Sequence, residues 1–136
     1  MTLNKRILLI DDDADFNMII RRYLEKQGFE VESAYNGKQG LEKVYDNPPD
    51  LILLDVMMPE MDGYKVCSEL KNDKNYDEIP IILLTSVGDN VTSGEVEKPP
   101  TRYSHQGGRS VVADDFLSKP SSAEEITKSV RRLLDV

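Results

Sequence analysis

Five polar residues of this chain stand directly after, or close to, short apolar runs. Asp11 and Asp12 follow one run, Asp55 follows a second and Thr85 a third, while Lys119 comes one residue after a shorter run. Carboxylates crowded together repel one another unless a cation neutralises them, and their oxygens suit a hard divalent ion such as Mg²⁺. The ammonium and the hydroxyl can instead hold an anion. The set therefore fits a phosphoryl group carried next to a carboxylate.

Within this set, Asp55 is the best candidate for a nucleophile. It stands alone after its run, whereas Asp11 and Asp12 are adjacent and better placed to cradle a metal ion. An isolated residue of this kind is more often a cap or a loop residue. The joint pattern at four run ends favours a functional site over that structural explanation.

The apolar runs have the length of buried strands and alternate with helical patterns, which is typical of a parallel sheet. We predict an open α/β sheet with right-handed crossovers and helices on both faces. Its strands are predicted over 6–10, 30–34, 50–54, 80–84 and 115–118. Ligands of such sheets bind outside the carboxyl ends of the strands, so these ends should bring the five polar residues together.

Four helices are predicted between and after these strands. The first has an apolar stripe, is capped by Asp13 or Asp15 and stops at Gly28; its stripe is Phe16, Ile19, Ile20, Tyr23 and Leu24. The second, 37–46, turns Leu41, Val44 and Tyr45 inward. The third directs Val66, Cys67 and Leu70 to the core. The last follows Pro120, with Ser121 or Ser122 as its cap and Glu125 available for a capping box.

One stretch, 87–112, breaks the alternation. A helix is expected there, but the stretch contains Pro99-Pro100 and several glycines, which disfavour a helix. We expect an atypical fourth crossover, a loop with at most a helical turn around 92–97. It is either a contact that orders with a partner or an insertion that the surface tolerates.

Length and composition describe a single domain over 1–136 that can bury a core without disulfides. The formal charge of −8 argues against direct nucleic-acid binding. Cys67 is the single cysteine, which suits a reducing, cytoplasmic setting, and it is expected to be a small core residue. No signal peptide and no membrane-spanning run is visible.

Four stretches of the chain resemble the receiver domains of bacterial response regulators in two-component phosphorelay signalling. They are ILLIDDD at 7–13, LLDVMMPEMDG at 53–63, IILLTS at 81–86 and DDFLSKP at 114–120. The resemblance covers essentially the whole chain except 87–112. It implies a flavodoxin-like three-layer sandwich whose five-stranded parallel sheet has the order 2-1-3-4-5.

The same resemblance implies a role for each residue of the cluster. Asp55 would become an aspartyl phosphate, taking its phosphoryl group from a histidine kinase or a histidine phosphotransfer protein. Asp12 and Asp55 would ligate Mg²⁺ or Mn²⁺ directly, Asp11 through water, and the Met57 backbone carbonyl would be a further ligand. Lys119 would pair with the phosphoryl group.

The resemblance also implies a signalling switch rather than an enzyme with a released product. Thr85 would move toward the phosphoryl group while Phe116 turns inward, and partner binding would change. The protein would catalyse only its own phosphorylation and dephosphorylation, as a monomer or as a phosphorylation-dependent dimer.

Two other classes of protein share part of this pattern. A phosphatase of the haloacid dehalogenase type also uses an Asp nucleophile with Mg²⁺, but it needs an acid two residues later, where Met57 stands. A flavodoxin-like cofactor binder needs a phosphate-cradling loop after the first strand, where the chain has three aspartates, 11–13.

Overall fold

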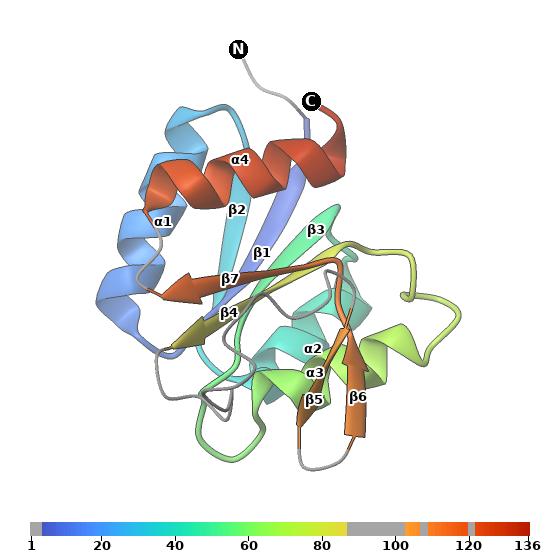
Figure 1. Cartoon of the computed structure of the whole chain (residues 1–136). Coiled ribbons are helices and arrows are strands. Elements are labelled where there is room, and N and C mark those ends of the chain that lie inside the picture. The colour runs from blue at the N-terminus through green and yellow to red at the C-terminus, as the bar shows by residue number, and fades with distance from the viewer. Residues whose placement is uncertain (1–3, 87–102, 107–108, 120–121) are drawn as a thin grey trace.

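The computed structural model describes residues 4–86, 103–106, 109–119 and 122–136. Five parallel strands form its main sheet in the order β2-β1-β3-β4-β7 (Figure 1). They are β1 (Arg6–Ile10), β2 (Glu30–Ala34), β3 (Leu51–Asp55), β4 (Ile81–Ser86) and β7 (Asp115–Lys119). Because β7 is the fifth strand of this sheet along the chain, the predicted order 2-1-3-4-5 is confirmed.

Helices cover both faces of the sheet, as expected for a three-layer α/β fold. One face carries α1 (Ala14–Lys26) and α4 (Ala123–Leu134), and the other carries α2 (Gly37–Asp46) and α3 (Gly63–Lys71) (Figure 1). None of the described helices is long and apolar enough to cross a membrane.

The central strands are apolar throughout because both of their faces are buried. Alternate residues of β1, β3 and β4 point to opposite layers, as the pleat requires. The layer with α1 and α4 receives Ile7, Leu9, Leu51, Leu53, Ile82 and Leu84. The layer with α2 and α3 receives Leu8, Ile10, Ile52, Leu54, Ile81 and Leu83. Cys67 lies in this second layer as predicted, fully buried, and burial raises the pKa of its thiol to about 12.

The structure shows which of the alternative N-cap residues caps each of two helices. Asp13 caps α1, accepting a hydrogen bond from the Phe16 N–H at 3.1 Å. Ser122 caps α4 in a capping box with Glu125. Gly28 follows the end of α1 with φ of 103°, a left-handed conformation that glycine adopts without strain.

Two residues that were predicted to face the core are exposed. Ile19 of α1 is 57% exposed, because Ile20 and Leu24 define the line of the helix that meets the sheet. Tyr45 of α2 is 47% exposed, and its ring packs instead against Tyr76, with 5.2 Å between the ring centroids. In both cases the predicted stripe was one residue too wide for the helix face that is buried.

The fourth crossover differs from the predicted loop. Within 87–112 the structure contains an antiparallel hairpin of β5 (Tyr103–Gln106) and β6 (Arg109–Val112), and β6 lies beside α3 (Figure 1). Gln106 pairs with Arg109, so two residues connect the strands. The sequence carried a signal that was missed, because Gly107-Gly108 is a typical two-residue hairpin connection. The predicted helical turn at 92–97 lies outside the described residues.

A partly buried ammonium ties the α3–β4 connection to the residues before β7. Lys71 Nζ donates to Asp114 Oδ2 at 2.8 Å and to the carbonyls of Asp77 at 3.1 Å and Ile79 at 3.0 Å. Asp114 Oδ2 also accepts the Ile81 backbone N–H at 2.8 Å. Removing either partner would leave the other charge without its main contact.

We therefore expect Lys71→Met to lower the free energy of unfolding by about 2–3 kcal/mol, measured by urea denaturation. Arg21→Ala is the control, because Arg21 pairs with Glu25 at 3.2 Å on an exposed helix surface, where such pairs contribute under about 0.5 kcal/mol. Equal losses in the two variants would show that the Lys71 contacts add no stability.

Candidate functional site

The structure brings the predicted carboxylates and the ammonium together at the carboxyl edge of the sheet. Asp11 directly follows β1, Asp55 ends β3 and Lys119 ends β7. Lys119 Nζ donates to Asp11 Oδ2 at 2.8 Å and lies 3.5 Å from Asp55 Oδ1. Asp11, Asp12 and Asp55 each offer a carboxylate oxygen within 4.8 Å of the others.

Asp55 differs from the other two acids in its surroundings. Its side chain is buried, and among the described residues its Oδ1 has no hydrogen-bond partner. Burial, together with the charges of Asp11 and Asp12, raises the pKa of Asp55 to about 7, although Lys119 opposes the shift. A buried carboxylate oxygen without a donor, beside two more carboxylates, fits a hard divalent cation by its chemistry.

Burial also acts on the other two charged groups. It raises the pKa of Asp11 even though the hydrogen bond from Lys119 opposes the change. Burial works to lower the pKa of Lys119, but the hydrogen bond and charge of Asp11 and the charge of Asp55 outweigh it, so that this pKa is raised. Lys119 therefore remains a cation at neutral pH, and the two acids that face it have raised pKa values.

A buried polar network fixes the loop that carries Asp11. The Asn17 side-chain amide donates to the backbone carbonyls of Asp11 at 3.1 Å and Ala34 at 3.3 Å, and Ser33 Oγ donates to Asn17 Oδ1. The Asp13 N–H donates to Asp11 Oδ1 at 2.8 Å. Sequence reasoning missed Asn17 and Ser33. The available signal was a polar residue three positions before Ile20, on the line of α1 that faces the sheet.

The loop after Asp55 depends on a glycine. The Gly63 N–H donates to the Val56 carbonyl at 2.9 Å, at the start of α3. A Cβ atom at position 63 would lie 2.2 Å from the Asp55 carbonyl oxygen and 2.9 Å from Val56 Cα. This close approach of two backbones fixes where β3 ends, and with it the position of the Asp55 side chain.

The remaining predicted residues lie near the same edge. Thr85 is half-buried on β4, paired in register with Ser118 of β7. Phe116 lies earlier on β7, is half-buried, and packs against the core layer of α2 and α3. Met57 follows Asp55 by two residues and is 55% exposed. These positions are compatible with the predicted roles and do not test them.

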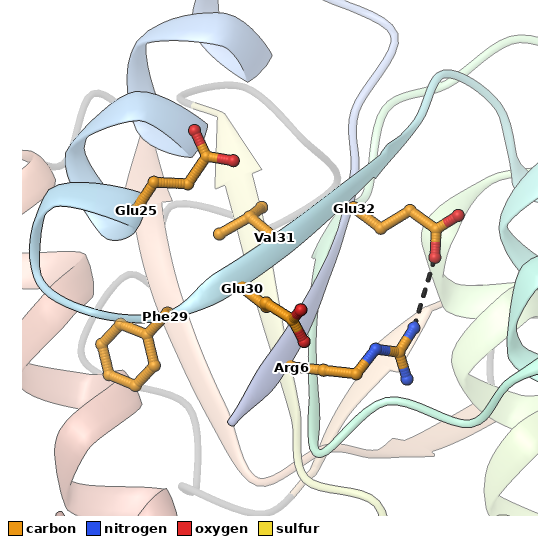
Figure 2. Close-up of a pocket in the computed structure, with 6 residues that line it drawn as sticks. All are labelled: Arg6, Glu25, Phe29, Glu30, Val31 and Glu32. Carbon is orange, nitrogen blue, oxygen red and sulfur yellow. Dashed lines mark hydrogen bonds and ion pairs between the residues drawn. The ribbon is translucent and has the colours of Figure 1, made fainter. Parts of the chain in front are cut away.

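A cavity of about 370 Å³ lies away from this cluster, along the outer strand β2 (Figure 2). It is lined by Arg6, Glu25, Phe29, Glu30, Val31 and Glu32. The dashed contact in Figure 2 is the 3.4 Å ion pair between Arg6 and Glu32. Arg6 begins β1, whereas Asp11 follows its end, so the cavity opens at the opposite end of the strand from the carboxylates.

Comparison with known sequences gives one consistent family. Residues 7–99 match the response regulator receiver domain. RpaA of Synechocystis, named a DNA-binding dual master transcriptional regulator, is 36% identical over 129 residues, which cover 95% of this chain and 48% of that protein. PhoP of Bacillus subtilis, named an alkaline phosphatase synthesis transcriptional regulatory protein, is 33% identical over 97% of this chain and 49% of its own length. The chain thus spans about half the length of these relatives.

Solved structures agree with this family in fold. The signal receiver domain of a histidine kinase from Syntrophus aciditrophicus is 32% identical, with a TM-score of 0.78 over 96% of this chain and 90% of that one. The receiver domain of the Francisella response regulator 1452 is 28% identical, with a TM-score of 0.77 over 97% and 98% of the two chains. This chain belongs to the receiver domain family of two-component response regulators.

Proposed function

We propose that this protein is a phosphorylation switch whose phosphoacceptor is Asp55. The observation that carries the proposal is the buried Oδ1 of Asp55, which has no hydrogen-bond donor among the described residues and lies 3.5 Å from Lys119 Nζ. This oxygen lies next to a cation and accepts no hydrogen bond from the described residues, so it is available to bind a new group. The donor is a phosphohistidine, carried by a sensor histidine kinase or a histidine phosphotransfer protein.

The proposed transfer exchanges one bond to phosphorus for another. A carboxylate oxygen of Asp55 attacks phosphorus, an acyl phosphate P–O bond forms, and the P–N bond of the donor breaks. The leaving imidazole nitrogen takes a proton from solvent, and the donor returns to a neutral histidine. The Lys119 ammonium stabilises the negative charge of the phosphoryl group, as positioned cations do in phosphoryl transfer.

The three carboxylates are the proposed holders of Mg²⁺ or Mn²⁺. Asp12 and Asp55 would bind the ion directly, Asp11 through water, and the Met57 carbonyl would complete the protein ligands. When bound, the ion neutralises charge on the carboxylates and on the transferring group. Asp12 is exposed whereas Asp11 and Asp55 are buried, so the cluster is open on one side, where a phosphoryl donor could approach.

The readout is proposed to run through Thr85 and Phe116 on the neighbouring strands β4 and β7. A dianionic group on Asp55 attracts the Thr85 hydroxyl, and the space that it leaves can be filled by the Phe116 ring. The surface that changes would then include β7 and the hairpin in the atypical crossover, within one receiver unit over 1–136. This unit would act by partner binding, because its charge of −8 disfavours direct contact with nucleic acid.

A direct test is phosphorylation by acetyl phosphate with Mg²⁺, followed by separation on a phosphate-binding gel. The wild-type protein should shift, and Asp55→Asn should not, because an amide is a far weaker nucleophile. Asp50→Asn is a matched control, since Asp50 lies at the other end of β3 and accepts the Arg6 N–H. A shift that persists in Asp55→Asn, or its loss in Asp50→Asn, would contradict the proposal.

A further inference from the structure

One aromatic side chain touches the reactive edge of the sheet and has no role in the account so far. Phe16 is the third residue of α1, and its ring centroid lies 4.4 Å from Lys119 Nζ. The Lys119 side chain is only 16% exposed. In the part of the chain that the structure describes, its ammonium lies beside the Asp11 carboxylate at 2.8 Å, the Asp55 carboxylate at 3.5 Å and the face of the Phe16 ring.

The position of this ring is fixed by the same loop that carries the acids. Asp13 accepts the Phe16 N–H at 3.1 Å, and the Asp13 N–H donates to Asp11. The ring also packs against the core layer formed with α1 and α4. Phe16 is thus held by a backbone hydrogen bond and by the packing of its ring. Lys119, in contrast, has a flexible side chain and is the last residue of an outer strand.

An ammonium is attracted to the negative face of an aromatic ring, and the attraction is stronger where water is excluded. Unlike a carboxylate, the ring takes no hydrogen bond from the ammonium and presents no net charge. It can hold the cation near Asp55 without competing for its N–H groups when an anion arrives. A third carboxylate in place of the ring would bind the ammonium and keep it from the incoming phosphoryl group.

We propose that Phe16 is a positioning residue, whose ring face keeps the Lys119 ammonium between Asp11 and Asp55, ready for the phosphoryl group. The inference rests on the proposed phosphorylation of Asp55 and adds a residue to it. The proposed effect depends on the electron density of the ring face and not on the volume of the ring. Substitutions that change only the electron density therefore test it.

The test replaces Phe16 in the full chain with mono-, di- and trifluorinated phenylalanine, which nearly preserve shape while withdrawing charge from the ring face. The rate constant of phosphorylation by acetyl phosphate should fall stepwise, by roughly five- to thirtyfold in total, the range expected for a desolvated cation–π contact. The rate constant of Phe16→Leu should fall by a similar amount, and that of Phe16→Tyr should stay near the wild-type value.

A matched control exists at the other end of the sheet. Phe29, just before β2, faces the Arg131 guanidinium at 5.5 Å from its ring centroid. The same fluorinated series at position 29 should leave the phosphorylation rate unchanged. If the wild type is phosphorylated and the rate does not vary along the Phe16 series, the ring acts only by packing and the inference is overturned. If the wild type is not phosphorylated at Asp55, the proposed function itself fails.

Discussion

Without a divalent ion, the protein should lose stability as the pH rises from about 5 to about 8, by on the order of 3 kcal/mol. Asp55 causes most of this loss, because its pKa is raised from 3.8 to about 7 in the folded state. Between these two values the folded protein holds a proton that the unfolded chain has released, so each step up in pH favours unfolding. Asp11, whose pKa is also raised, acts in the same direction.

Urea denaturation in a chelator at several pH values checks this expectation. Asp55→Asn should remove most of the slope and be more stable than wild type at about pH 8, because the amide carries no charge to bury. Excess Mg²⁺ should stabilise the wild type at that pH and leave Asp55→Asn much less affected. A wild type whose stability is flat or rises over this pH range would contradict the proposed crowding of buried carboxylates.

Gly63→Ala should cost about 3 kcal/mol of unfolding free energy and also slow phosphorylation. The added Cβ would lie 2.2 Å from the Asp55 carbonyl oxygen, and both atoms belong to or adjoin the backbone. Neither can move without shifting the end of β3 or the start of α3. The shift would displace the Asp55 carboxylate from Lys119, so stability and phosphorylation rate should fall together.

Gly40→Ala is the matched control within α2. Its added Cβ would meet the Ile10 side chain, with Cδ1 2.5 Å and Cγ1 2.9 Å away, and a side chain can shift more readily than a backbone can. Alanine is also the better helix former in this position. We expect a smaller loss of stability and an unchanged phosphorylation rate. A Gly63→Ala protein as stable and as reactive as wild type would show that the loop adapts without cost.

Sequence reasoning located the sheet and the reactive edge because both depend on local patterns. An apolar run followed by a polar residue shows a buried strand and its functional end at once, so Asp11, Asp55 and Lys119 were found together. The roles of these residues remain predictions, but their proximity at one edge is an observed feature of the fold.

What was missed depends on contacts between distant segments. Asn17 and Ser33 looked like ordinary polar residues, and the network that joins them to the Asp11 backbone forms only when α1 packs beside β2. The contact between Phe16 and Lys119 joins residues more than a hundred positions apart. The hairpin was not predicted because glycine both disfavours a helix and favours a turn, so the glycines of 87–112 fit a loop as well as a hairpin.

The identity of the modified residue is the most direct test of the account. The protein would be treated with acetyl phosphate and Mg²⁺ and then reduced with borohydride, which converts an aspartyl phosphate to homoserine. Peptide mass spectrometry would then locate the homoserine. We predict conversion at Asp55 alone. Conversion at Asp11 or Asp12, or a phosphorylated protein in which no aspartate is converted, would contradict the central claim.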